Sequence, residues 1–229
     1  MPLIEIDHVS HVYGDASGRV VLREVTVTLD EHRIGIIGAN GSGKSTFIRL
    51  LNGLVMPTQG TVRIDGLDTR THAKDVRRNV GFCFTNPDSQ IVMPTVREDV
   101  AFGLLRRHTP RPEVDRRVTE LLVAFDLIDY ADHPAHLLSG GQKQLLALAS
   151  ILVTEPALLV LDEPTTLLDL RNARQVHSVV DALPQQVVLV SHHLDLLEAF
   201  DRVLVFDDGR IACDDSPQRA IDYYRHLMS

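Results

Sequence analysis

A glycine-rich loop between an apolar strand and a helix constrains the fold of this chain more than any other feature. Residues 38–45 read Gly-Ala-Asn-Gly-Ser-Gly-Lys-Ser. The apolar segment 33–37 precedes the loop, and residues 44–52 have the pattern of a helix that ends before Gly53. Glycines at these spacings let backbone N–H groups turn inward around a phosphate, and the positive end of the helix points at the same anion. The pattern predicts a P-loop in an α/β core that binds a nucleoside triphosphate.

The polar residues of the loop have separate expected roles. Lys44 is expected to reach the β- and γ-phosphates, Ser45 to ligate Mg²⁺, and Thr46 to bring a hydroxyl near the α-phosphate. ATP and Mg²⁺ are therefore the expected ligands. The residues of this segment expected to bind the nucleotide are Gly38, Asn40, Gly41, Ser42, Gly43, Lys44, Ser45 and Thr46.

Length and composition narrow the class of protein. The 229 residues, 44% of them apolar, suffice for one large α/β domain or for a core with inserted lobes. The formal net charge of −8 argues against a protein that coats nucleic acid. Cys83 and Cys213 lack metal-ligand spacing and predict a reducing compartment. No secretory signal is recognised, and no apolar run approaches the ~20 residues of a membrane helix, so a cytoplasmic protein is expected, in which any membrane role comes through partners.

Hydrophobic patterning predicts a single domain over residues 1–229, with a helical lobe inserted into an α/β core. Segments 3–7 and 20–29 alternate as half-buried antiparallel strands do. Five prolines punctuate residues 87–140, where segment 113–125 carries a helical apolar stripe, and this region is interpreted as the lobe. The remaining expected elements are strands 60–65, 80–84, 157–161 and 187–190, helices 142–153, 171–182 and 194–199, a hairpin of 203–206 with 210–212, and a final helix capped by Ser216 and Pro217.

Two predicted strands end in residues suited to phosphate chemistry. The apolar run 157–161 leads directly to Asp162 and Glu163, and the run 187–190 is followed by His192. Ligands of open α/β sheets bind at these carboxyl ends. Asp162 is expected to hold Mg²⁺, Glu163 to orient or deprotonate the attacking water, and His192 to hydrogen-bond the γ-phosphate. Without the P-loop, Glu163 would be read as a solvated strand-end charge.

A second predicted anion site lies at Ser139, Gly140 and Gly141, within the sequence Leu-Ser-Gly-Gly-Gln of residues 138–142. A serine and free backbone N–H groups at a helix N-terminus favour an anion, and two glycines allow a close approach to the backbone. The P-loop already supplies this chain's own phosphate cradle. We therefore expect the second site to serve the nucleotide of a neighbouring chain, so that two chains enclose ATP.

Together these motifs resemble those of the ATP-binding cassette (ABC) ATPases over essentially the whole chain. The resemblance implies a P-loop NTPase fold with a RecA-like core, an N-terminal antiparallel β subdomain and an inserted α-helical subdomain. It also implies that Tyr13 stacks on adenine, that Asp169 lies in the loop joining two opposed sites, and that His192 is the switch histidine. ATP hydrolysis in a dimer is the implied activity.

A finer resemblance lies in Asn-Pro-Asp-Ser-Gln at residues 86–90 and in Met-Pro-Thr-Val-Arg-Glu-Asp-Val-Ala-Phe-Gly at residues 93–103. These segments are similar to the ATPase subunits of energy-coupling factor (ECF) importers of vitamins and metals. Gln90 belongs to this pattern and is a candidate nucleotide-site residue. Thr85 stands where the family usually has a glutamine that contacts Mg²⁺ and the γ-phosphate, which implies a weaker contact. Residues 166–168, Thr-Leu-Leu, are bulkier than the usual Ala-Gly-Leu, and a C-terminal extension common in ECF ATPases is not seen.

The resemblance implies membrane partners, namely the T component and the substrate-binding S component of an ECF importer, with the chain at the cytoplasmic face of the membrane. The compact length and residues 84–88 are most similar to the ATPases of biotin importers, so biotin is the favoured cargo and cobalt or nickel the alternative. A homodimer is expected, with a heterodimer containing a second ABC ATPase left open. The alternative of another class is a non-transport ABC switch that acts on DNA or soluble partners. Its best support is the arginine-rich stretch 106–117.

Overall fold

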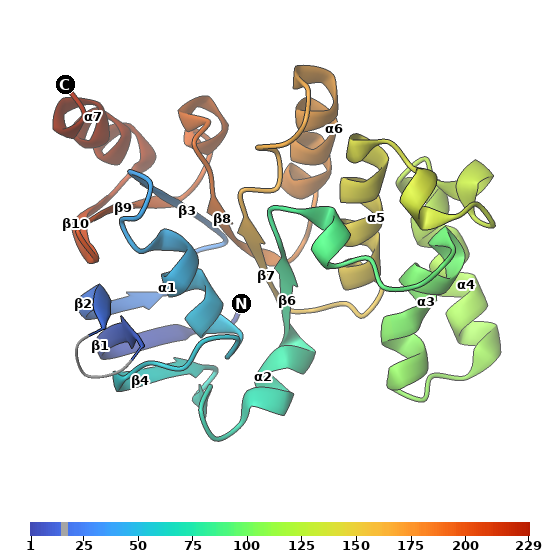
Figure 1. The fold of residues 1–229 in the computed structure, drawn as a ribbon, viewed down its shortest axis with the longest axis horizontal. Coiled ribbons are helices and arrows are strands. Elements are labelled where there is room, and N and C mark those ends of the chain that lie inside the picture. Colours follow the sequence, from blue (N-terminus) through green and yellow to red (C-terminus); the bar gives the residue numbers. More distant parts are fainter. Residues whose placement is uncertain (15–17) are drawn as a thin grey trace. The chain divides into compact units, whose positions relative to one another are not determined.

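The computed structural model describes residues 1–14 and 18–229. The chain forms two compact units, and Figure 1 draws the ribbon of both. The first unit contains residues 1–81, 157–163 and 184–229, and the second contains residues 82–156 and 164–183. The second unit thus begins before residue 87 and includes helices that follow residue 140. In the described residues, no helix combines the length and the apolar character that crossing a membrane requires.

The antiparallel sheet of the first unit has the strand order β2-β1-β4-β5. Its strands are β1 (Ile4–Tyr13), β2 (Arg19–Leu29), β4 (Gln59–Ile64) and β5 (Leu67–Asp68). The predicted N-terminal antiparallel subdomain is confirmed, although β1 is longer than the expected segment 3–7. Register shifts against β2 follow Ile6 and Val9. Such irregularities interrupt the strict alternation by which a strand is recognised in sequence, so the strand expected from the sequence is shorter than β1.

Parallel pairing organises the second sheet of this unit, in which β10, β9, β3, β8 and β7 lie in that order. These strands are β3 (Arg33–Gly38), β7 (Leu158–Asp162), β8 (Gln186–Val190), β9 (Arg202–Asp207) and β10 (Arg210–Asp215). Every residue of β3, β7 and β8 is buried, as expected of parallel strands covered on both faces. Val190 is in register with both Ile36 and Asp162, so the carboxyl ends of these three strands lie along one row.

Helices of the first unit are α1 (Lys44–Leu51), α2 (Ala73–Asn79) and α7 (Pro217–Leu227). The predicted short helix 194–199 is a 3-10 turn, Leu194–Leu197. Ser216 occupies the N-cap position of α7, but its side chain makes no capping hydrogen bond. Helix α2 was not predicted, because it buries only Val76 and so leaves no apolar stripe in the sequence.

Four helices form most of the second unit: α3 (Val96–Arg106), α4 (Arg111–Ala124), α5 (Gly140–Leu152) and α6 (Leu170–Asp181). Strand β6 (Val80–Cys83) leads into this unit from the first. Helix α3 starts at a reciprocal capping box between Thr95 and Glu98 and contacts both α4 and α5. The apolar stripe predicted for α4 is buried at positions 114, 118 and 122.

The core of the first unit provides a test of how α1 is held. Phe47 of α1 is fully buried, and its ring centroid lies 4.9 Å from that of Phe206 on β9. We expect Phe47→Ala to lower the free energy of unfolding by about 3–5 kcal/mol, because the truncation leaves a cavity beneath the helix. Urea denaturation measures this. Tyr223→Ala, which truncates an exposed ring of α7, is the control and should change stability by less than about 0.5 kcal/mol. Equal effects of the two changes would contradict the assignment of Phe47 to the core.

Candidate active site

The glycine loop adopts a backbone that other residues could not follow. Gly38 and Gly43 have φ angles of 149° and 107°. A Cβ at Gly38 would collide with the carbonyl oxygen of Phe206, and a Cβ at Gly43 would lie 2.8 Å from that of Val21. Gly43 is also the N-cap of α1, so no side chain caps the first turn of this helix. Its leading N–H groups therefore remain available to an anion.

Lys44 is held across this loop by two backbone carbonyls. Its Nζ donates to Gly38 O at 2.7 Å and to Ala39 O at 2.9 Å. Burial lowers the pKa of Lys44 from its usual value, while the charges of Glu163 and Asp162 act in the opposite direction. The side chain is only 5% exposed. A buried ammonium among backbone oxygens is suited to a ligand that brings negative charge.

Asp162 is a buried carboxylate at the end of β7. Its two oxygens accept hydrogen bonds from Ser45 Oγ at 3.0 Å and from Arg49 Nη2 at 3.3 Å. Burial raises the pKa of Asp162, and the hydrogen bond from Ser45 and the charge of Arg49 oppose that rise. A raised folded-state pKa contributes stability below the ordinary carboxyl pKa, and this contribution is lost as pH rises through the folded-state value. At neutral pH the buried charge is therefore incompletely compensated, and a cation beside it would supply what is missing.

Glu163 and His192 meet beside the P-loop strand. His192 Nε2 lies 2.9 Å from Glu163 Oε1. The backbone N–H of Glu163 donates to Val190 O at 3.1 Å, which ties the tip of β7 to that of β8. Glu163 has φ 51°, a conformation that is uncommon outside glycine. The left-handed backbone turns this side chain out of the strand direction, and such strain clusters at functional sites.

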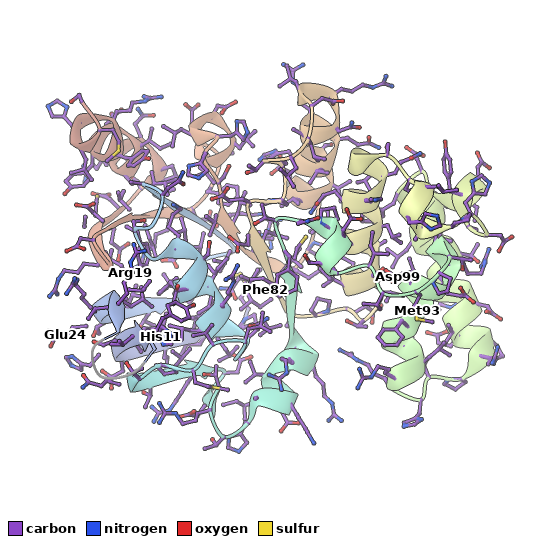
Figure 2. The ribbon with its side chains drawn as sticks, in the orientation of Figure 1. His11, Arg19, Glu24, Phe82, Met93 and Asp99 are labelled. Atoms are coloured by element: carbon purple, nitrogen blue, oxygen red, sulfur yellow. The ribbon has the colours of Figure 1, made fainter. Side chains whose placement is uncertain are left out.

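A cavity of about 280 Å³ adjoins these residues in the first unit. Tyr13 stands at its edge, 43% exposed, with its Oη 3.4 Å from Thr46 Oγ1 and its ring edge-on to His11. Arg19, whose side chain is labelled in Figure 2, also lines the cavity. It was not predicted, because an exposed arginine at the start of an alternating strand carries no distinctive sequence signal. The residues lining the cavity are Tyr13, Arg19, Val21, Asn40, Gly41, Gly43, Lys44, Ser45, Thr46 and Glu163.

The predicted second anion site begins helix α5 in the second unit. Ser139 caps α5 reciprocally with Gln142, by hydrogen bonds of 3.3 Å and 2.9 Å. A Cβ at Gly141 would collide with the side chain of Asn172. We call Ser139, Gly140 and Gly141 the serine–glycine turn.

Asp169 lies close to this turn through Asn172. Its carboxylate caps α6 by accepting hydrogen bonds from the backbone N–H of Asn172 at 2.8 Å and from its Nδ2 at 3.0 Å. The structure thus brings Gly141 and Asp169 together on one asparagine. Sequence reasoning missed Asn172, although its position three residues after a capping aspartate was a usable signal.

Thr85 and Gln90 also belong to the second unit, whereas residues of the first unit line the cavity. Thr85 is half-buried after β6. Gln90 has both ends of its amide engaged: Oε1 accepts from Phe84 N at 3.3 Å, and Nε2 donates to Ala147 O at 2.9 Å. The side chain of Gln90 therefore ties its loop to α5.

The residues of the first unit fit a nucleoside triphosphate and a divalent cation. Ser42 Oγ is buried and has no hydrogen-bond partner among the described residues, so the loop contains a hydroxyl that lacks an acceptor or donor. The glycine backbone leaves space that a side chain would fill. Ser45 and Asp162 present the hydroxyl and carboxylate oxygens that Mg²⁺ prefers.

Comparison with known proteins identifies a protein family with which this chain shares sequence similarity. The sequence profile described as "ABC transporter" matches residues 22–166. A putative ABC transporter ATP-binding protein of Bartonella quintana is 54% identical over the whole of both chains. The biotin transport ATP-binding protein BioM of Rhizobium etli is 46% identical over 92% of this chain and 94% of its own. The energy-coupling factor transporter ATP-binding protein EcfA1 of Caldanaerobacter subterraneus is 40% identical over 94% of this chain and 81% of its own.

Solved structures have the same fold. The structure of cbiO1 from Clostridium perfringens, described as part of the ABC transporter complex cbiONQ, superposes with a TM-score of 0.84 at 27% identity and covers 98% of this chain and 92% of its own. The ATP-binding cassette MJ0796, described as dimeric in a post-hydrolysis state with ADP and Pi, superposes with a TM-score of 0.83 at 26% identity over 93% and 98%. The expected α/β P-loop architecture with an antiparallel N-terminal sheet is confirmed.

The unpartnered hydroxyl of Ser42 predicts that one substitution has opposite effects on stability and on ATP binding. We expect Ser42→Ala to raise the free energy of unfolding without nucleotide by about 1 kcal/mol, because it removes a buried polar group that has no partner. The same change should weaken ATP binding about tenfold, because the ligand loses one donor or acceptor.

Thermal unfolding and titration with ATP measure the two effects of Ser42→Ala. The control is Ser89→Ala, which removes an exposed hydroxyl of the second unit and should leave both quantities nearly unchanged. A loss of stability in the Ser42 variant would mean that its hydroxyl has a partner in the nucleotide-free protein.

Proposed function

The chain belongs to the ABC transporter ATP-binding proteins, ATPases that drive transport, and from this premise we propose that it is the motor subunit of an ECF-type importer. Biotin is the favoured cargo. The observation that carries the hydrolytic role is the contact of His192 with Glu163 beside the P-loop cavity. The importer type rests on residues 86–103 and on the identity of 40–46% to BioM and EcfA1 proteins.

In this proposal the first unit binds and cleaves ATP. Lys44 and the backbone N–H groups of the glycine loop hold the phosphates, and Tyr13 stacks on adenine. Ser45 and Asp162 would hold Mg²⁺, which when bound neutralises charge on phosphate oxygens. Glu163 orients the attacking water and accepts its proton. His192 keeps the Glu163 carboxylate in place and hydrogen-bonds the terminal phosphate.

The serine–glycine turn would complete the site of a facing chain. Ser139 and Gly140 are exposed at the N-terminus of α5, where a hydroxyl and a positive helix end favour an anion. Leu167 and Leu170 flank Asp169 and are 65% and 66% exposed, which suits a surface that a second chain covers. The structure of MJ0796, described as dimeric, supports an assembly of two chains. A homodimer is the simplest assembly, and a heterodimer with a second ABC ATPase would satisfy the same surfaces.

Coupling to transport would occur at the loop of residues 86–95, which we call the coupling loop. Its Val92 and Pro94 are exposed, so they can meet the T component, while the S component selects the cargo. The chain would then work at the cytoplasmic face of the membrane. Thr85, which immediately precedes this loop, has a shorter side chain than the glutamine usual at this position in the family.

The alternative of a DNA-bound switch is not favoured by the arginine-rich surface. Arg116 is paired with Glu113 and Glu120, and Arg117 with Glu113 and Glu155. The pairing leaves little unbalanced positive charge for phosphates on this helix.

Uptake tests the importer proposal directly. In cells that carry Lys44→Ala in this chain, we expect uptake of labelled biotin to fall to background, because the motor can no longer hold the phosphates. Purification of the wild-type chain from detergent-solubilised membranes should bring integral membrane subunits with it. Loss of cobalt or nickel uptake with normal biotin uptake would assign the alternative cargo. Co-purification with nucleic acid in place of membrane subunits would overturn the importer proposal.

The role of Glu163 has its own test. We expect Glu163→Gln to lower kcat for ATP at least about 100-fold, because the amide cannot accept the proton of water. The variant should also accumulate as an ATP-bound dimer, which size-exclusion chromatography detects. Glu155→Gln is the matched control, since Glu155 also has positive φ but is exposed and precedes β7, whereas Glu163 follows that strand. Unaltered turnover in the Glu163 variant would refute the assigned base.

A further inference from the structure

A set of contacts along one face of α5 joins this helix to residues 83–99 of the second unit. Lys143 Nζ lies 2.7 Å from Asp88 Oδ1, and Gln144 Nε2 lies 3.1 Å from Cys83 Sγ. One turn further on, the carbonyl of Ala147 accepts from Gln90, as described above. Another turn on, Ser150 Oγ donates to Asp99 Oδ2 at 2.8 Å. Positions 143, 144, 147 and 150 share one side of a helix.

These contacts differ in strength because they differ in exposure. The Asp88 side chain is 62% exposed, so its pair with Lys143 contributes little. Asp99 is 3% exposed and accepts three hydrogen bonds: Oδ1 from the N–H groups of Val92 at 2.8 Å and Met93 at 3.0 Å, and Oδ2 from Ser150 (Figure 2). A buried carboxylate with three donors is costly to disturb. It is therefore the strongest link between the coupling loop and α5.

We propose that Asp99 is the positioning residue through which the coupling loop holds α5, and with α5 the serine–glycine turn at its N-terminus. One oxygen of Asp99 fixes the backbone of the loop, and the other fixes the helix. Gln90 provides a second link to α5, one helical turn closer to the serine–glycine turn. Because α5 is a continuous helix from Gly140 to Leu152, a displacement of the loop moves the turn with it. The importance of the serine–glycine turn for ATP hydrolysis rests on the proposed function. The contacts of Asp99 with the coupling loop and α5 are independent of it.

Hydrogen exchange of the nucleotide-free protein tests the link itself. Ser150→Ala removes the contact with α5 and leaves Asp99 on the loop. We expect the amides of α5 between residues 143 and 150 to exchange about tenfold faster, which corresponds to about 1.4 kcal/mol, while the amides of Val92 and Met93 stay protected. Asp99→Ala should release both the loop and α5. The control is Asp129→Asn, an exposed carboxylate of the same unit, which should change neither.

Asp99→Asn is the conservative variant. Its amide oxygen can still accept from Val92 and Met93, and its amide nitrogen can donate to the Ser150 hydroxyl. We therefore expect it to restore most of the protection lost in Asp99→Ala. Faster exchange confined to Val92 and Met93 in Asp99→Ala would overturn the proposal, because the loop would then not hold α5. Equal acceleration in α4 would also overturn it, because the effect would be a general loss of stability.

Steady-state kinetics test the consequence for hydrolysis. We expect Asp99→Ala to lower kcat about tenfold with KM for ATP changed by less than about twofold, since residues of the first unit line the nucleotide cavity. Asp99→Asn should recover most of the rate. A raised KM with unchanged kcat would overturn the proposal. Ser139→Ala separates the two levels of inference: if it leaves kcat unchanged, the proposed role of the turn fails, and hydrogen exchange alone then decides whether Asp99 holds α5.

Discussion

Parallel pairing at a common register is the constraint on which the active site depends. Ile36, Val190 and Asp162 occupy one row across β3, β8 and β7. The glycine loop, His192 and Glu163 each follow their strand within two residues of that row. A slip of one residue in either pairing would turn the side chains of that strand to the opposite face and separate these groups. Fully buried apolar strands make such a slip costly, so the core sets the geometry of the chemistry.

The site holds charges under burial that the nucleotide-free fold does not fully compensate. Lys44 and Asp162 are each at most 5% exposed. Burial lowers the pKa of Lys44 and raises that of Asp162, and both changes favour the neutral form of the side chain. The left-handed backbone of Glu163 adds strain at the same edge of the sheet. Sites that are destabilised alone and satisfied by a ligand are the usual compromise between stability and function. Here the compensating groups would be a polyanion for Lys44 and a cation for Asp162.

Local patterns were enough to predict the elements that carry chemistry, and tertiary contacts account for what was missed. The P-loop, Asp162 and Glu163 follow uninterrupted apolar runs, so sequence reasoning found both the strands and their tips. By contrast, the burial of Asp99 depends on the approach of Ser150 on α5, 51 residues away along the chain, and nothing in the local sequence distinguishes Asp99 from an exposed helix carboxylate. Arg19 is similar, since its place at the cavity is set by how β2 passes the P-loop.

Asn172 contacts two predicted functional segments of the second unit, the serine–glycine turn and Asp169. Its side chain occupies the space that a Cβ at Gly141 would need, while its amide and backbone N–H bind the Asp169 carboxylate. Gly141 is therefore required for packing between helices as well as for an open backbone beside an anion. Asp169 likewise caps α6 in addition to any contact with a facing chain. Because both residues meet on the same side chain, Asn172 links the Asp169 loop directly to the serine–glycine turn.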